Sequence, residues 1–235
     1  MIDGPRVPPA SGAPPRSLVI LLHGYGSNGA DLISLAPYWR GVLPGAAFVA
    51  PNAPEPCPGA PDGYQWWSIT SFDPSPPPFT GEGDRAAVEG APRAAGAARA
   101  APILEAFIDA ELARQGLDDS RLALVGFSQG TMMALQVGPA RPWALAGIVG
   151  YSGMLADEAA LAATVSRPPV LLIHGDSDPM IPLSNFSEAK AALTREGFSV
   201  ESHVSHGLGH SIDGVGLELG GRFLARVLGS GGASP

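Results

Sequence analysis

The pentapeptide Gly126–Gly130, Gly-Phe-Ser-Gln-Gly, constrains the fold of this chain more than any other stretch. It overlaps the end of the apolar run Leu122–Phe127, which has the length of a buried strand, and it precedes Thr131–Val137, which is predicted to be a helix. A strand that turns into a helix so abruptly needs glycines two positions either side of Ser128, because side chains there would collide. The pattern therefore predicts a strand–turn–helix unit with Ser128 at its tip, beside the free N–H groups of a helix N-terminus.

Further aliphatic runs alternate with segments of helical character along the chain. Continuous runs suit central parallel strands, whereas the more alternating Phe198–Val204 suits a strand nearer the edge. The expected strands are Leu18–Leu22, Ala47–Ala50, Leu122–Phe127, Leu145–Tyr151, Val170–His174 and Phe198–Val204. The expected helices are Asp31–Trp39, Pro92–Gln115 with a kink at Pro102, Thr131–Val137, Asp157–Ala163, Leu183–Glu196 and Leu217–Leu228. The alternation predicts one α/β domain over 17–229, a three-layer sandwich around a mostly parallel sheet, with a flexible N-terminal tail at 1–16 and a C-terminal tail at 230–235.

Residues 53–83 interrupt this alternation. The segment is rich in proline and glycine, with three successive prolines at 76–78, and a loop of this length is unusual in a compact domain. It nevertheless carries Tyr64, Trp66, Trp67, Ile69, Phe72 and Phe79. One interpretation is an irregular loop pinned to the surface, and the other is a lid or wall over a pocket. We favour the lid because disordered linkers rarely carry so many aromatic residues; the aromatic side chains would equally suit a homodimer contact.

The bulk composition limits the classes of function. The formal net charge is −8 and the basic residues form no cluster, which argues against nucleic acid or an anionic membrane as the main partner. Cys57 is the only cysteine, so an internal disulfide is excluded and a reducing compartment is indicated. No signal peptide and no membrane-spanning stretch is found, which predicts a cytoplasmic protein without stable membrane insertion.

A serine hydroxyl becomes a good nucleophile only beside a base that takes its proton and an acid that orients the base. His210 lies in a glycine-containing turn after the last expected strand, where its imidazole has the freedom to reach Ser128. The acid is expected after the strand that ends at His174: Asp178 is held extended by the following proline, whereas Asp176 is also suited to stabilising the turn. The alternatives are a solvent-exposed loop histidine and a glycine-rich turn without chemistry, since the chain holds 31 glycines.

Backbone amides are the expected partners of the negative charge that develops when a serine attacks a carbonyl. The first candidate donor is the N–H of Gln129, and a second is expected from the glycine-rich turn 23–27. The glycines at 24, 26 and 29 also fit a dinucleotide-binding pattern, but the next strand ends in Ala-Pro-Asn at 50–52 instead of the acidic residue that would hold a ribose. No histidine or cysteine pattern typical of a metal site is present, so no metal is expected.

Together these segments resemble the phospholipase/carboxylesterase family of α/β-hydrolases, which includes acyl-protein thioesterases. The resemblance covers the chain from about residue 18 to the last helix. The matching pieces are Leu21–Gly26, Ala50–Pro54, Trp66-Trp67, Gly126–Gly130, His174–Pro179 and Gly209–Ser211. The resemblance implies an α/β-hydrolase fold with Ser128 as nucleophile, Asp178 as acid and His210 as base, in the chain order typical of that fold.

The resemblance also implies roles around the substrate. The N–H groups of Tyr25 and Gln129 would form the oxyanion hole, and Trp67 would wall the acyl site. Two features depart from the family's pattern. The Pro-rich segment around Pro76 is longer than in the shorter members, and Thr131 stands where a further glycine is common, a change expected to affect only helix packing.

The expected activity is that of a cofactor-free serine carboxylesterase. Its substrates would be small-molecule esters with short- to medium-length acyl chains, with lysophospholipids and thioesters as further candidates. A non-catalytic binding protein on the same scaffold is one alternative, because fold does not determine function. An acyltransferase that uses the same triad is the other.

Overall fold

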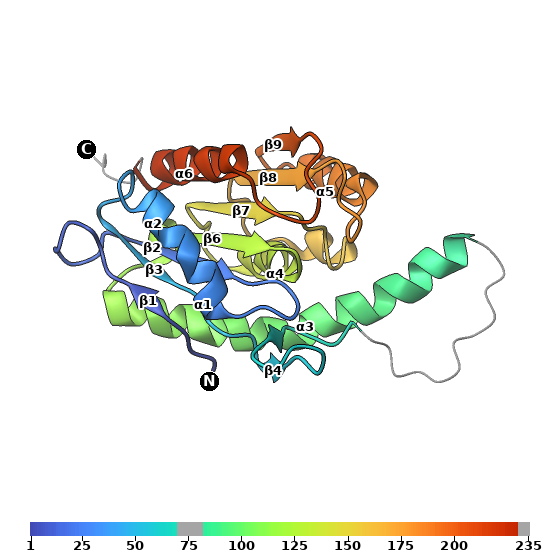
Figure 1. Cartoon of the computed structure of the whole chain (residues 1–235), viewed down its shortest axis with the longest axis horizontal. Helices are drawn as coiled ribbons and strands as arrows, with labels where there is room; N and C mark the ends of the chain where they lie inside the picture. The colour runs from blue at the N-terminus through green and yellow to red at the C-terminus, as the bar shows by residue number, and fades with distance from the viewer. Residues whose placement is uncertain (70–81, 230–235) are drawn as a thin grey trace.

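A seven-stranded sheet forms the centre of the molecule (Figure 1), in the strand order β1-β3-β2-β6-β7-β8-β9. The computed structural model describes residues 1–69 and 82–229, with the backbone alone considered over 82–91. The strands are β1 (Arg6–Val7), β2 (Ser17–Leu22), β3 (Ala46–Val49), β6 (Leu122–Phe127), β7 (Gly147–Tyr151), β8 (Val170–Gly175) and β9 (Val200–Ser205). All neighbours are parallel except β1 and β3. The predicted mostly parallel sheet is confirmed, with β9 at its edge.

Helices cover both faces of this sheet and complete the predicted three layers (Figure 1). One layer holds α3 (Glu82–Gln115), α4 (Gln129–Val137) and α5 (Leu183–Arg195), and the other holds α1 (Gly29–Leu32), α2 (Ala36–Trp39) and α6 (Gly214–Gly229). Short 3-10 helices occur at Ile33–Leu35, Asp119–Arg121, Gly138–Ala140 and Ala159–Ala163. Ile20 and Leu124 belong to the apolar cluster under α3 and α4, whereas their neighbours Val19 and Val125 belong to the cluster under α2 and α6. Strands buried on both faces must be apolar throughout, which explains the continuous aliphatic runs.

The strand register brings several chain segments together at one edge of the sheet. Leu22 of β2 lies opposite Gly126 of β6, and Phe127 lies opposite Tyr151 of β7. Because these strands are parallel, the turns that follow them leave the sheet side by side. The glycine-rich turn 23–27 is therefore a neighbour of Ser128.

The N-terminal segment corrects the expectation of a flexible tail at 1–16. Arg6 and Val7 pair with β3 as an antiparallel edge strand. The Arg6 guanidinium also donates to the carboxylate of Glu111 in α3 at 2.5 Å, and the Glu111 side chain is only 1% exposed. A buried carboxylate requires such a partner. The segment is thus fixed by a residue far along the chain, which its own composition does not reveal.

The segment 53–69 packs against the body of the molecule. It forms the short antiparallel pair β4 (Glu55–Pro56) and β5 (Tyr64–Gln65). Trp66 and Trp67 are buried, so they act as core residues of this segment. The proline run at 76–78, together with Phe72 and Phe79, lies outside the described residues.

Most predicted helices differ by a few residues from their observed bounds, and those predicted at 92–115 and 157–163 differ most in extent or type. α3 begins at Glu82 instead of Pro92, and its first turns project beyond the sheet (Figure 1). The last residues of the predicted loop 53–83 therefore belong to a helix. The glycines and acidic residues in this stretch do not form a helical pattern, so the sequence did not predict it. The helix predicted at 157–163 is the 3-10 helix Ala159–Ala163.

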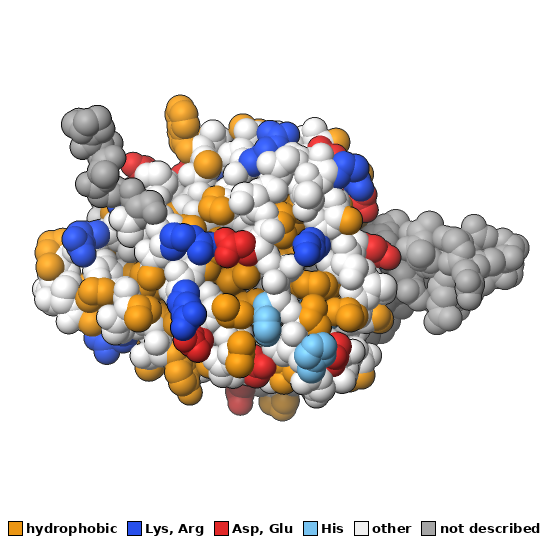
Figure 2. Space-filling view, turned by 90° about the horizontal axis from the view of Figure 1, so that it is seen from above, with side chains coloured by type: hydrophobic (Ala, Val, Ile, Leu, Met, Phe, Trp, Pro, Cys, Tyr) orange, Lys and Arg blue, Asp and Glu red, His pale blue; other side chains and the backbone are white. Residues whose placement is uncertain are grey.

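The surface has a mixed character. On the face seen in Figure 2, basic and acidic side chains are interspersed with hydrophobic ones. Within the described residues, the helices all lack an apolar stretch long enough to cross a bilayer. Ile69 and Met180 are exposed large hydrophobic side chains, at 57% and 68%, and both lie at the site described below.

A tight contact between β7 and α6 gives a test of this packing. A methyl group at Gly220 would lie 2.0 Å from the hydroxyl oxygen of Tyr151, which donates to the carbonyl of Gly216 at 3.0 Å. We expect Gly220→Ala to lower the free energy of unfolding by about 1–3 kcal/mol, because overpacking outweighs alanine's better helix propensity. Chemical denaturation measures this change. Gly214→Ala in the same helix is the control, since the described structure leaves room for its methyl group; an equal loss in both variants would contradict the account.

Candidate active site

Ser128 lies at the tip of the predicted turn, between β6 and α4. Its backbone has φ 55° and ψ −116°, a conformation that costs energy for a residue other than glycine. Two glycines make the turn possible: a methyl group at Gly130 would lie 1.9 Å from the carbonyl oxygen of Leu22, and one at Gly126 would lie 2.4 Å from that of Gly130. The Ser128 N–H donates to the carbonyl of Tyr151 at 2.9 Å. The strand–turn–helix prediction is confirmed.

Thr131 takes part in this turn as well as in helix packing. Its hydroxyl lies 2.8 Å from the carbonyl oxygen of Gly126 and 2.9 Å from that of Tyr151, so its single proton is shared between the ends of β6 and β7. Methyl groups at Gly150 and Gly153 would lie within 2.6 Å of the Thr131 side chain. The absence of side chains at Gly150 and Gly153 therefore leaves room for the Thr131 side chain. The sequence-based expectation that Thr131 affects only helix packing was incomplete, because its hydroxyl also bonds to the backbone.

His210 is hydrogen-bonded to Asp178. The distance from His210 Nδ1 to Asp178 Oδ2 is 2.7 Å, and the other carboxylate oxygen accepts the N–H groups of Met180 and Ile181 at 2.8 and 2.9 Å. Burial alone would raise the pKa of Asp178, but the hydrogen bonds from Ile181, His210 and Met180 outweigh it and the pKa lies below its ordinary value. The carboxylate is therefore ionised at neutral pH, and His210 Nδ1 is the donor.

Asp176 serves a different histidine. Its carboxylate bonds to His206 Nδ1 at 2.8 Å and accepts the N–H of Gly207 at 2.7 Å. The side chains of His206 and Asp176 are 91% and 28% exposed, so this pair lies at the surface. The hydrogen bond with His206 is the main cause that lowers the pKa of Asp176. Of the two candidate acids, only Asp178 contacts His210.

Ser152 anchors the loop that carries His210. It follows β7 directly, and its N–H donates to the carbonyl of Ile173 at 2.9 Å. Its φ is 44°, in the left-handed region, and its buried hydroxyl donates to the carbonyl of Ser211 at 3.2 Å. The histidine loop is thereby tied to the strand next to the one that ends at Ser128.

Ser128 and His210 line one cavity of about 380 Å³ at the carboxyl edge of the sheet. Tyr25, Gln129 and Trp67 line the same cavity, so all predicted site residues other than the buried Asp178 reach it. The remaining lining is mostly apolar and is made of Ser68, Ile69, Pro92, Arg93, Met132, Met154, Met180 and Ile181. Part of the segment predicted to be a lid, residues 67–69, therefore forms a wall of this cavity.

The base and the serine are neighbours without a direct bond. Among the described residues, no hydrogen bond joins the Ser128 hydroxyl to the imidazole of His210, although both groups face the cavity. The His210 ring packs against Phe127, with ring centroids 4.9 Å apart. Catalytic hydrogen bonds are often long in the absence of substrate and shorten when it binds.

The glycine-rich turn lies against Ser128. A methyl group at Gly24 would lie 3.2 Å from the Ser128 Cβ, and no backbone carbonyl of the described chain accepts the N–H of Tyr25. His23 fixes this turn: its Nε2 accepts the N–H of Ala53 at 2.9 Å, so its Nδ1 carries the proton and donates to the carbonyl of Gly24 at 2.8 Å. Within residues 1–69 and 82–229, no cluster of three histidine, cysteine or carboxylate side chains suits a metal ion.

Comparison with known proteins decides the family. The sequence profile described as Phospholipase/Carboxylesterase matches residues 7–228. This chain belongs to the phospholipase/carboxylesterase family. It is 29% identical over 209 residues to the esterase YpfH of Escherichia coli (strain K12), covering 88% of this chain and 81% of that one. It is 30% identical over 220 residues to acyl-protein thioesterase 1 of Schizosaccharomyces pombe, covering 90% and 91%.

A solved structure agrees with this assignment. The crystal structure of esterase PE8 matches with a TM-score of 0.86 and 41% sequence identity, covering 97% of this chain and 99% of that one. The α/β-hydrolase fold and the class of carboxylic ester hydrolase, both predicted from the sequence, are confirmed at the level of the phospholipase/carboxylesterase family.

In this member of the phospholipase/carboxylesterase family, some residues of the site were not predicted from the sequence. Ser152 directly follows a parallel strand, as Ser128 does, and this shared position is the sequence feature that would have identified it. Met132 and Met154 line the cavity, but in the sequence they are indistinguishable from core residues. The carboxamide of Gln129 is also a site group that the sequence does not reveal, because its partners lie far away along the chain.

The buried His23 predicts a pH dependence of stability. Burial lowers its pKa below the ordinary value and outweighs the opposing hydrogen bond to Gly24. The folded protein therefore stays unprotonated at His23 at a pH where the unfolded chain takes up a proton. We expect the free energy of unfolding to be fully retained above about pH 6.5 and to fall as the pH drops below it.

Urea denaturation between pH 5 and pH 8 measures this effect. The variant His23→Asn should be less stable at every pH, because it loses the bond from Ala53 to Nε2 and leaves a cavity where the ring was, but its stability should depend less on pH in this window. An undiminished pH dependence in His23→Asn would contradict the assignment.

Proposed function

We propose that this protein hydrolyses carboxylic esters through an acyl-enzyme formed on Ser128. The observation that carries the proposal is the 2.7 Å bond between His210 and the buried Asp178, in a cavity that Ser128 also lines. Because Nδ1 of the imidazole donates to an ionised carboxylate, Nε2 is the nitrogen free to accept a proton.

The reaction follows from these groups in two steps. His210 takes the proton of the Ser128 hydroxyl while the oxygen attacks the ester carbonyl, and Asp178 stabilises the resulting imidazolium. His210 then gives the proton to the leaving alcohol, and the acyl group stays on Ser128. A water molecule, deprotonated by the same imidazole, then attacks the acyl-enzyme; the bond from the acyl carbon to the Ser128 oxygen breaks, His210 returns the proton to that oxygen, and the acid leaves.

The N–H groups of Tyr25 and Gln129 are proposed to bind the oxyanion in both steps. Gln129 begins α4, so its N–H belongs to the free first turn of a helix. The approach of the turn at Gly24 to Ser128 supports the second donor. In comparable sites one such donor contributes about 10²–10³ in kcat.

The apolar wall favours an apolar acyl group. Trp67, Met132, Met154 and Ile181 line the cavity, and its volume of about 380 Å³ suits a short or medium acyl chain. Relatives named as an esterase and as an acyl-protein thioesterase support oxygen esters and thioesters as substrates, with lysophospholipids as a further candidate. Cytoplasmic location and a homodimer stay predictions from the sequence.

Replacement of the nucleophile tests the proposal most simply. Ser128→Ala should abolish hydrolysis of p-nitrophenyl butyrate and should prevent labelling by a fluorophosphonate, while the melting temperature stays near that of the unmodified protein. Mass spectrometry should find one adduct, on Ser128, in the unmodified protein. Retention of most activity in Ser128→Ala would contradict the assignment, and an unmodified protein without any adduct would indicate a non-catalytic binding protein.

The two carboxylates give a matched pair of variants. In Asp178→Asn the amide oxygen can still accept the N–H groups of Met180 and Ile181, and its NH₂ group then faces His210 and enforces the wrong tautomer. We expect kcat to fall by about 10³–10⁴. Asp176→Asn removes an exposed contact and should change kcat less than about threefold. The reverse ranking would mean that Asp176 is the acid.

A further inference from the structure

The carboxamide of Gln129 is a second functional element of this residue. The side chain is 2% exposed, and both of its polar atoms are bonded to the segment 53–69. Its Oε1 accepts the N–H of Trp66 at 2.9 Å, and its Nε2 donates to the carbonyl of Trp67 at 2.9 Å. One side chain thus binds the backbone of two successive residues.

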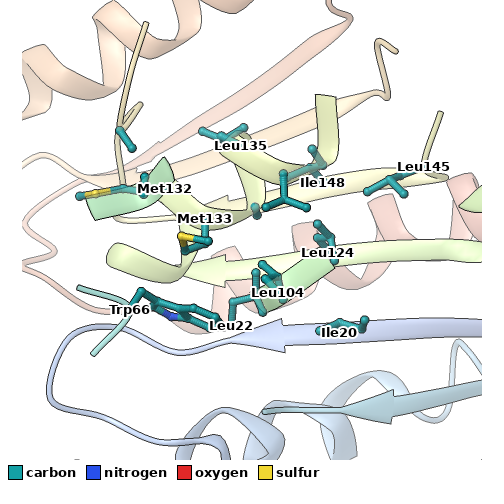
Figure 3. Packing of buried hydrophobic residues seen from close by; sticks show 14 of the residues in the cluster. Ile20, Leu22, Trp66, Leu104, Leu124, Met132, Met133, Leu135, Leu145 and Ile148 are labelled. Carbon is teal, nitrogen blue, oxygen red and sulfur yellow. The ribbon is translucent and has the colours of Figure 1, made fainter. Parts of the chain in front are cut away.

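Trp66 connects the same segment to the other side of the site. Its indole Nε1 donates to the carbonyl of His23 at 3.1 Å, and the side chain is 1% exposed. Figure 3 shows Trp66 beside Leu22, at the end of β2, and close to Met133 of α4. The carbonyl of His23 lies two residues before the N–H of Tyr25, and the carboxamide of Gln129 belongs to the residue whose N–H is the other donor.

We propose that the carboxamide of Gln129 and the indole of Trp66 are positioning groups that fix the two oxyanion donors relative to each other. This inference rests on the proposed function. The path runs from Gln129 through the backbone of Trp66 and Trp67 to His23, and from there to Tyr25. None of these bonds touches the substrate, so their effect is on where the two donors point.

Kinetic measurements distinguish this positioning role from a purely structural one. Oxyanion donors act in the transition state, so a small displacement of either lowers kcat while substrate binding changes little. A bond that only holds the loop would lower stability and leave the kcat of the folded protein unchanged. The split between kcat and KM therefore distinguishes the two roles.

Gln129→Glu gives a test that is specific to the carboxamide. A protonated carboxyl has the same shape, and it accepts the N–H of Trp66 and donates to the carbonyl of Trp67 as the amide does. An ionised carboxylate cannot donate and would face that carbonyl with negative charge. Burial disfavours the charged form, so the introduced carboxyl should change its protonation state nearer to neutral pH than an exposed one.

The expected result is a pH-dependent recovery. At pH 8, kcat for p-nitrophenyl butyrate should be at least about tenfold below that of the unmodified protein, with KM within about threefold. The ratio of the two kcat values should rise as the pH is lowered toward 5.5, because the ratio cancels any pH dependence of the reaction that both proteins share. Gln136→Glu, a half-buried position of the same helix, adds the same charge and should give a ratio independent of pH.

Trp66→Phe tests the other end of the path. It removes the indole donor to His23 and keeps an aromatic ring, and we expect kcat to fall several-fold with little change in KM. Trp39→Phe is the matched control: the Trp39 indole is equally buried and donates to the carbonyl of Leu217 at 2.9 Å, on the opposite face of the sheet. This control should lower the melting temperature and leave kcat unchanged.

The possible outcomes distinguish a failure of the positioning role from a failure of the proposed esterase function. An active unmodified protein together with a folded Gln129→Glu variant of normal kcat at pH 8 and a flat ratio would overturn this inference and leave the proposed function standing. An unmodified protein without esterase activity would overturn both. If Gln129→Glu fails to fold, Trp66→Phe decides: a lowered kcat at unchanged KM supports the inference, and an unchanged kcat overturns it.

Discussion

The backbone of Ser128 is held in a conformation that a free chain avoids, and the arrangement of the site depends on that constraint. The conformation persists because Gly130 passes so close to the carbonyl groups of Leu22 and His23 that no side chain would fit between them. The hydroxyl of Thr131 and the N–H of Ser128 then tie the turn to the end of β7. Helix α4, β2 and β7 thus jointly determine the direction in which the serine leaves the sheet.

The apolar body of the molecule supports these polar turns. Because β2, β6, β7 and β8 run parallel and are buried on both faces, their carboxyl ends meet at one edge. That edge receives Ser128 and Ser152 directly after their strands, and Tyr25 and Asp178 in the turns that follow β2 and β8. His210 comes from the loop after β9 and is fixed by Asp178. The polar groups are therefore held by rigid elements, which is the condition for a preorganised site.

The sequence predicted those parts of the fold that local patterns determine. The strand Leu122–Phe127 has its predicted bounds because a continuous apolar run between polar residues admits few other structures. Of the two carboxylates that the sequence offers after β8, Asp178 bonds to His210 and Asp176 bonds to His206; the role of Asp178 as the catalytic acid stays a prediction. Contacts between distant residues could not be predicted: the strand at Arg6 depends on Glu111 in α3, and the carboxamide of Gln129 finds its partners in a loop that precedes it by some sixty residues.

A crystal structure of the protein after reaction with a small alkyl fluorophosphonate tests the central claim most directly. The account predicts a single adduct on the Ser128 oxygen, with one phosphonyl oxygen within about 3.1 Å of the N–H groups of both Tyr25 and Gln129. It also predicts that His210 Nε2 lies within hydrogen-bonding distance of the adduct while Nδ1 stays bonded to Asp178. An adduct on another residue, or a phosphonyl oxygen that points into solvent away from both amides, would contradict it.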